Sequence, residues 1–269
     1  MPTPPAYFHQ DERPAGVPIW RETLAGLDWL SLRASPIFYG WGATRGDGAP
    51  VVVVPGFLGS DLYLLELHCW LERIGYRAYL SRIGRNAECI DLLVDRLFET
   101  IDRAHEDTGR GVHLIGHSLG GVLSRAAAAR RPERIASVIT LGSPFRGIRS
   151  HPLVMGATTA VRARLQRQGR GPDCYTGRCG CDSVRALQTL PPVPQIAIYT
   201  RSDGIVDWRA CVNDDRETDF EVSGTHVGLV FNHAVYELIA ARLAVATSPI
   251  GTPIRSTNQS RCSVSPSTS

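Results

Sequence analysis

The sequence predicts an α/β protein with a mostly parallel central sheet flanked by helices. Val51–Val54 is a run of four valines without a polar face, which is typical of a strand buried on both sides. From there to residue 141, strand and helix patterns alternate along the chain, as right-handed crossovers between parallel strands require. A chain of 269 residues with 43% hydrophobic residues is long and apolar enough to bury such a core.

The part of the chain before the first strand has a different pattern. Residues 1–18 hold five of the 18 prolines and are expected to form an arm. Over residues 20–32, apolar side chains recur at every third or fourth position and predict an amphipathic helix packed on the main domain. Its predicted packing stripe consists of Trp20, Leu24, Leu27 and Leu30. We therefore divide the chain into 1–48, an arm with a packing helix, and 49–246, the main domain.

Further strands and helices follow in order. Helix 88–105 has one apolar stripe, helix 119–131 ends before Pro132, and Asn232 is a candidate N-cap for the last helix. The alternation breaks over residues 144–190, which predicts an insertion with a helix at 153–167. Residues 247–269 contain 14 Ser, Thr or Pro among 23 and are expected to be a disordered tail. The other predicted elements are helix 62–74 and strands 76–80, 112–115, 135–141, 194–200 and 219–222.

Composition excludes several classes of partner. All 29 basic residues are arginines, and they are scattered among 26 acidic residues, so that no basic stripe predicts nucleic-acid or anionic-membrane binding. The first residues show no cationic and apolar leader, and no run of about 18 apolar residues occurs. We therefore expect a cytoplasmic protein without a transmembrane segment, while its oligomeric state stays open.

The most informative motif is Gly-His-Ser-Leu-Gly-Gly at 116–121. It follows a predicted strand directly and precedes a predicted helix, as a nucleophile elbow requires. The turn is so tight that the positions two before and two after Ser118 need glycine, and the helix points its positive N-terminus at the serine. We predict that Ser118 is a nucleophile; the alternative is an ordinary turn between strand and helix.

A nucleophilic serine needs a base, and the base needs an acid to fix its tautomer. Asp203 follows the predicted strand 194–200, and His226 lies in a glycine-flanked loop before the last helix, so we predict these two as acid and base. Asp207 is the rival acid or else a solvated or capping carboxylate. His233 is expected on the surface, and His117 is expected to shape the pocket.

Acyl transfer also needs donors for a tetrahedral oxyanion, usually two backbone N–H groups. Leu119, directly after Ser118, should supply one, and Phe57, after the flexible Gly56, should supply the other. A plain glycine-rich turn is the alternative for the second loop. No phosphate-binding glycine motif follows a strand, and a chain without lysine cannot have a P-loop.

In these motifs the chain resembles the α/β-hydrolase superfamily, and more closely its bacterial lipases and esterases. The matching stretches occur in the same order, over about residues 50–245. They are Pro-Gly-Phe-Leu-Gly-Ser (55–60), the Ser118 motif (116–121), Ser-Asp-Gly-Ile-Val (202–206) and Thr-His-Val-Gly-Leu (225–229). The resemblance implies an α/β-hydrolase fold with a short insertion, the triad Ser118, Asp203 and His226, and no cofactor. It departs at Pro55-Gly56, where the family usually has His-Gly.

Several cysteines and acidic residues outside the predicted triad are candidate metal ligands. Cys174, Cys179, Cys181 and Cys211 could bind zinc, but their spacing fits poorly; a disulfide between the insertion and Cys211, or free thiols, are the other options. The acidic residues between 214 and 219 match no calcium-loop pattern and are expected to be solvated. We therefore predict no metal.

These residues predict a serine hydrolase that cleaves carboxylic esters through an acyl-enzyme on Ser118. An acyltransferase or thioesterase would use the same triad, and a non-catalytic binding protein on this fold is a further alternative. The insertion helix has an apolar stripe at Leu153, Val154 and Met155, continued by Val161 and Leu165. It should pack beside Ser118 or cover it, which favours medium to long acyl chains in lipid-like or small-molecule esters. The competing hypothesis is a helix packed permanently on the core and a small pocket that accepts only short esters.

Overall fold

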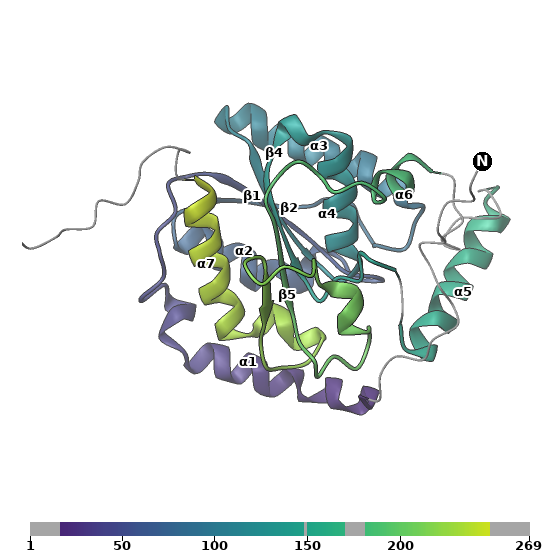
Figure 1. Cartoon of the computed structure of the whole chain (residues 1–269), viewed down its shortest axis with the longest axis horizontal. Helices are drawn as coiled ribbons and strands as arrows, with labels where there is room; N and C mark the ends of the chain where they lie inside the picture. The colour runs from purple at the N-terminus through teal and green to yellow at the C-terminus, as the bar shows by residue number, and fades with distance from the viewer. Residues whose placement is uncertain (1–16, 148–149, 170–180, 248–269) are drawn as a thin grey trace, which may run out of the picture.

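The computed structural model describes residues 17–147, 150–169 and 181–247. Its centre is a six-stranded sheet with the order β2-β1-β3-β4-β5-β6, in which every neighbouring pair is parallel (Figure 1). All six predicted strands are confirmed to within two residues at each end. The strands are β1 (Pro50–Val54), β2 (Arg77–Leu80), β3 (Val112–His117), β4 (Ile135–Leu141), β5 (Gln195–Tyr199) and β6 (Asp219–Glu221).

Helices cover both faces of this sheet. Helices α2 and α7 pack on one face, and α3 and α4 pack on the other (Figure 1). The Asn232 cap is confirmed, because its Oδ1 atom accepts a hydrogen bond of 2.9 Å from the Ala234 N–H. The α-helices are α1 (Ala25–Ala34), α2 (Leu65–Arg73), α3 (Ile90–Thr108), α4 (Leu119–Arg130), α5 (Pro152–Arg167), α6 (Asp182–Ala186) and α7 (His233–Thr247).

The valine strand β1 explains why the sheet is covered on both sides. Val51 and Val53 belong to the apolar core under α2 and α7, while Val52 and Val54 belong to the core under α3 and α4. All four side chains are fully buried. Alternate residues of a strand point to opposite faces, so an uninterrupted apolar run serves two helical layers at once.

The N-terminal helix packs on the main domain as predicted, but the face predicted to pack is wrong. Residues Ile19–Leu24 form a 3-10 helix, η1, which continues into α1. The predicted packing stripe faces solvent: Trp20 is 63% exposed and Leu27 is 61% exposed. Leu32, Glu22 and Asp28 face the body instead. Leu32 is buried, and the two acidic side chains accept hydrogen bonds from the loop at Thr225 and His226. Periodicity identifies an apolar face but does not say where that face points.

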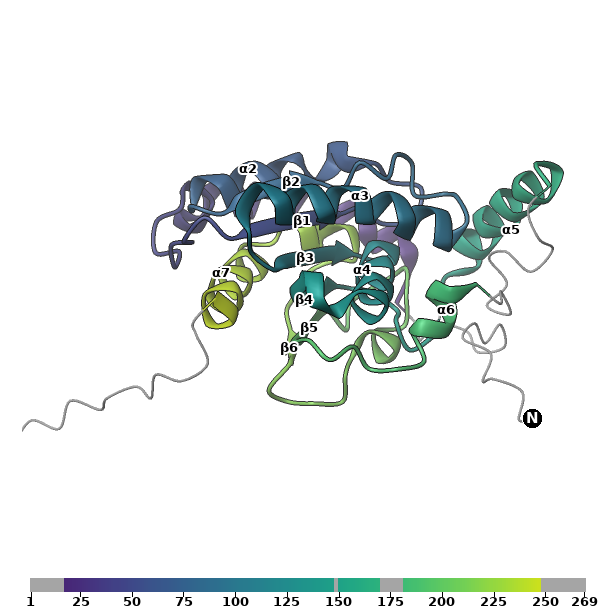
Figure 2. The same ribbon diagram turned by 90° about the horizontal axis from the view of Figure 1, so that it is seen from above.

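The insertion between β4 and β5 contains α5 and the short α6, which the sequence did not predict. Helix α5 projects from the body beside α6 (Figure 2). Val161 and Leu165, in its second half, are buried in an apolar cluster with Leu119 and Phe145. The first half of α5, with Val154 and Met155, lines a cavity.

Several predictions concern residues outside the described ranges, namely the arm before residue 17, the tail after residue 247, and Cys174 and Cys179. Cys211 is a free, buried thiol whose Sγ lies 3.7 Å from the Asp207 carbonyl oxygen, which contradicts a disulfide between Cys211 and the insertion. In the part of the chain that is described, no helix is long and apolar enough to cross a membrane.

Candidate active site

Ser118 lies in a strained turn between β3 and α4. Its backbone has φ 52° and ψ −124°, a conformation that non-glycine residues rarely adopt. A Cβ atom on Gly116 would approach the Gly121 backbone to 2.4 Å, and one on Gly120 would approach the Val54 carbonyl oxygen to 2.2 Å. Only glycine fits at both positions. The turn therefore holds the serine at the carboxyl edge of the sheet and at the N-terminus of α4.

Asp203 and His226 form a buried pair beside this turn. Asp203 Oδ2 lies 2.6 Å from His226 Nδ1, and the two residues are 6% and 4% exposed. Asp203 Oδ1 accepts hydrogen bonds of 2.8 Å from the N–H groups of Ile205 and Val206. An ionised carboxylate fixes the proton of the imidazole on Nδ1, which leaves Nε2 able to accept a proton.

The charge state of His226 follows from its surroundings. Burial lowers the pKa of His226, but the charge and hydrogen bond of Asp203, together with the charge of Glu22, raise it. The net pKa lies above the ordinary value of 6.5. The protonated imidazole that forms when a base takes up a proton is thus stabilised at this position.

The rival residues have other roles. Asp207 Oδ1 accepts a hydrogen bond of 3.0 Å from the Arg209 N–H and so caps the 3-10 helix at Trp208–Cys211. His233 is exposed at the start of α7. The structure therefore places Asp203, and not Asp207, against His226, and it places Ser118 and His226 in the lining of one cavity.

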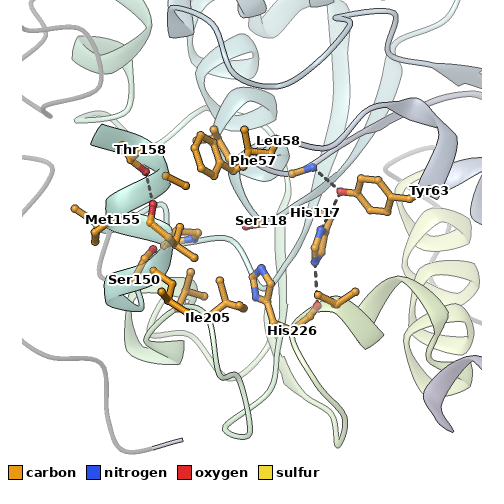
Figure 3. Close-up of a pocket in the computed structure, with 18 residues that line it drawn as sticks. Phe57, Leu58, Tyr63, His117, Ser118, Ser150, Met155, Thr158, Ile205 and His226 are labelled. Atoms are coloured by element: carbon orange, nitrogen blue, oxygen red, sulfur yellow. Dashed lines mark hydrogen bonds between the residues drawn. The ribbon is translucent and has the colours of Figure 1, made fainter. Parts of the chain in front are cut away.

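His117 connects two loops of the site. Tyr63 accepts a hydrogen bond from the Gly56 N–H and lies 3.0 Å from His117 Nδ1, while His117 Nε2 lies 3.0 Å from the His226 carbonyl oxygen (Figure 3). Burial, and then the charge of His226, lower the pKa of His117 to about 3, so this ring is neutral. The neutral ring accepts from the Tyr63 hydroxyl and donates to the carbonyl. Sequence reasoning missed Tyr63, because no motif marks it.

The same connection bears on the predicted oxyanion donors. The Gly56 N–H donates to the Tyr63 hydroxyl, and the predicted donor Phe57 is the next residue along the chain and lines the cavity. A Cβ atom on Gly56 would lie 3.0 Å from Ser118 Cβ, which shows how closely the loop approaches the serine. Leu119 is the first residue of α4, and amides at that position have no acceptor within their own helix.

An apolar cavity opens over Ser118 and His226. Its volume is about 430 Å³, and one of its walls is the first half of α5 (Figure 3). Leu58, Leu153 and Val227 line the cavity and are also at least 40% exposed, so they mark its mouth. The remaining lining residues are Gly56, Phe57, Tyr63, His117, Leu119, Pro144, Ser150, Val154, Met155, Ala157, Thr158, Ile205 and Val206.

Acidic side chains between residues 214 and 219 form hydrogen bonds and an ion pair with other groups of the protein. Asp219 accepts from the N–H groups of Asn213 and Asp215, at 2.8 and 3.0 Å, and Asp214 forms an ion pair with Arg146. Among the described residues, no cluster of three or more His, Cys, Asp or Glu side chains is arranged to hold a metal ion.

The chain is similar to known proteins over part of its length. Residues 50–183 match the family model described as palmitoyl protein thioesterase. A triacylglycerol lipase of Burkholderia plantarii is 31% identical over 133 residues, which are 46% of this chain and 37% of the lipase. Another, from Pseudarthrobacter phenanthrenivorans, is 32% identical over 36% of this chain and 34% of the lipase. The matched stretches thus span about a third of the length of these curated relatives.

Solved structures share the fold over more of the chain. A structure of the metagenome-derived lipolytic enzymes LipS and LipT gives a TM-score of 0.55 at 18% identity, covering 76% of this chain and 95% of that one. A soluble variant of the monoglyceride lipase of Saccharomyces cerevisiae gives 0.51 at 16% identity, covering 78% of this chain and 89% of that one. These likenesses concern the arrangement of the sheet and its helices.

Proposed function

We propose that this chain is a serine hydrolase of the α/β-hydrolase type, similar to bacterial lipases and esterases, which cleaves carboxylic esters through an acyl-enzyme on Ser118. The observation that carries the proposal is the Asp203–His226 pair, which is buried, joined at 2.6 Å and set beside a serine in a strained elbow. Each part of this arrangement matches a need of nucleophilic catalysis.

The proposed reaction begins with His226. Its Nε2 takes the proton of the Ser118 hydroxyl while Oγ attacks the ester carbonyl carbon, and the amides of Phe57 and Leu119 hold the oxyanion. The imidazolium then gives its proton to the alcohol oxygen as the carbon–oxygen bond breaks. A water molecule, deprotonated by the same Nε2, then attacks the carbonyl carbon of the acyl-enzyme. The imidazolium returns this proton to Ser118 Oγ as the bond between Oγ and the acyl carbon breaks, which releases the acid and restores the serine. Asp203 stays ionised and orients the imidazole throughout.

We propose medium to long acyl esters as substrates. The cavity of about 430 Å³ is lined mainly by apolar side chains, and Val154 and Met155 extend it along α5. Burying each methylene of an acyl chain in such a lining contributes about 0.8 kcal/mol. The curated relatives are triacylglycerol lipases, which favours a lipid ester as the substrate class.

A thioesterase activity is the second candidate. The family model that matches residues 50–183 is described as palmitoyl protein thioesterase, and that chemistry uses the same serine, base and acid. The two candidates share a long acyl chain and differ in the leaving group. A thioester offers a better leaving group than an ester, so this candidate depends less on proton donation by His226.

The test compares leaving groups and acyl lengths on one protein. Turnover should be measured on p-nitrophenyl esters from acetate to palmitate, on an emulsified triglyceride and on a palmitoyl thioester. Ester hydrolysis predicts that Ser118→Ala loses on the order of 10³-fold or more in kcat. A fluorophosphonate should add once, at Ser118. Turnover of the thioester alone would favour the thioesterase, and no turnover or labelling at all would refute both candidates.

A further inference from the structure

The carboxylate of Glu22 joins two loops of the candidate site. Its Oε1 atom accepts hydrogen bonds from the Gly204 N–H at 2.9 Å and the His226 N–H at 3.2 Å. Its Oε2 atom accepts from the Val227 N–H at 2.9 Å. Gly204 follows the acid Asp203 directly, so one side chain binds both the loop of the acid and the loop of the base.

The amides of His226 and Val227 need an acceptor, because the chain turns into a 3-10 helix at Val227–Phe231 and the first N–H groups of a helix have no partner within it. A carboxylate satisfies them more strongly than a neutral acceptor would, since hydrogen bonds to an ionised group are about twice as strong. Asp28 binds the same loop one residue earlier, accepting from the N–H and hydroxyl groups of Thr225 at 3.3 and 3.1 Å.

The two acids differ in what they do to the imidazole. The groups that face His226 are Asp203 from the loop after β5, Glu22 from η1, and His117 at the end of β3. The charge of Glu22 raises the pKa of His226, and its carboxylate binds the amide of His226 itself, whereas Asp28 binds Thr225, one residue earlier. Glu22 therefore combines a geometric link with a charge effect, while Asp28 supplies a geometric link.

We propose that Glu22 is a positioning residue of the active site, which sets the acid loop against the base loop and keeps a negative charge beside the imidazolium formed during acyl transfer. This inference rests on the proposed ester hydrolysis for its kinetic consequence, but its structural part does not. It makes the N-terminal helical segment part of the support of the active site, because Glu22 binds backbone amides of the two loops and is not among the residues that line the cavity.

The kinetic test uses Glu22→Gln, which keeps the shape and one acceptor but removes the charge, and Asp28→Asn as the matched control. Glu22→Gln should lower kcat for a p-nitrophenyl ester by roughly tenfold or more, with KM changed less than about twofold, because the loss falls on the transition state. The acidic limb of its pH profile should move to lower pH, because the charge that helps to raise the pKa of His226 is removed. Asp28→Asn should leave the position of that limb where it is.

A second measurement requires no activity. In a Ser118→Ala background, the ring signals of His226 are titrated by NMR with and without Glu22→Gln, and thermal melts check that each variant is folded. A lower pKa of His226 in Glu22→Gln, with no such change in Asp28→Asn, supports the proposal. Equal effects of the two variants on that pKa and on kcat would overturn it. If the NMR shift occurs but wild-type protein turns over no ester, the proposed function fails and the role of Glu22 in setting the imidazole stands.

Discussion

Asp203 Oδ2 lies 2.6 Å from the Nδ1 atom of His226, while Oδ1 of the same carboxylate accepts hydrogen bonds from two backbone amides of its own loop. The amide contacts hold the carboxylate in one orientation, so its second oxygen is aimed at the imidazole before any substrate arrives. Such fixed orientation is what a group needs if it is to hold a base in one tautomer.

The first prediction separates the two candidate acids. Asp203→Asn keeps an oxygen for the loop amides but presents NH2 to His226, which forces the wrong tautomer and should lower kcat by about 10⁴-fold. Asp207→Asn should stay within about tenfold of wild type, because Asp207 caps a 3-10 helix instead. Both variants are compared by kcat on the same ester. Greater damage from Asp207→Asn would make that residue the acid.

The second prediction concerns Tyr63. Tyr63→Phe removes the acceptor of the Gly56 N–H and the donor to His117, which loosens the loop that carries the predicted oxyanion donor Phe57. We expect kcat to fall by about tenfold while KM stays within about twofold, as for a loss felt in the transition state. Tyr79→Phe is the control, because the hydroxyl of the half-buried Tyr79 donates to Asp107 and neither residue lines the cavity. Equal kinetics for the two variants would contradict the role of Tyr63.

The third prediction concerns acyl length. Replacing Val154 and Met155 by Ser makes the α5 wall of the cavity polar, so kcat/KM for a decanoate ester should fall by about tenfold or more while that for a butyrate ester changes little. Ala160→Ser, at an exposed position of the same helix, controls for effects on the helix itself. A steep preference for acetate or butyrate that survives the double substitution would leave a short-chain esterase.

The fourth prediction concerns stability in acid. His113 is buried in β3 with its Nδ1 atom 2.8 Å from Ser137 Oγ, and burial lowers its pKa to about 4. Between that value and the unfolded pKa near 6.5, the unfolded state binds the additional proton, so stability falls as the pH falls. This contribution is about 2 kcal/mol of unfolding free energy by pH 5.

Urea unfolding at pH 7.5 and pH 5 checks this contribution. His113→Gln should lose about 2 kcal/mol less than wild type between the two pH values, and the comparison across pH cancels any constant cost of the substitution. His233→Gln, at an exposed histidine, should keep the whole wild-type pH dependence. An unchanged pH dependence in His113→Gln would show that another group accounts for the acid sensitivity.

The sheet could be predicted from sequence because each strand is a local apolar run and each crossover helix has its own stripe. The elbow at Ser118 was predictable for a related reason, since its glycines are required by contacts within a few residues and with adjacent strands. Asp203 and His226 could be proposed from their order and their loops, without any knowledge of the distance between them.

The contacts of the N-terminal helix could not be predicted in the same way. Glu22 accepts hydrogen bonds from backbone amides at Gly204 and His226, and backbone amides leave no trace in the identity of the residues that carry them. The stripe at Trp20 and Leu27 gave the opposite expectation, because a periodic pattern has no direction. The two halves of α5 also have different surroundings, which depend on tertiary contacts. Val161 and Val154 belong to one predicted stripe, but Val161 is buried in an apolar cluster and Val154 lines the cavity.

The long reach of Glu22 also bears on how the protein is made. Its hydrogen-bond partners Gly204 and His226 lie 182 and 204 positions further along the chain. Since synthesis runs from the N-terminus, a growing chain carries the serine elbow well before it carries the acid or the base. A nascent chain on the ribosome therefore cannot assemble the proposed triad until the loops that carry Asp203 and His226 have emerged.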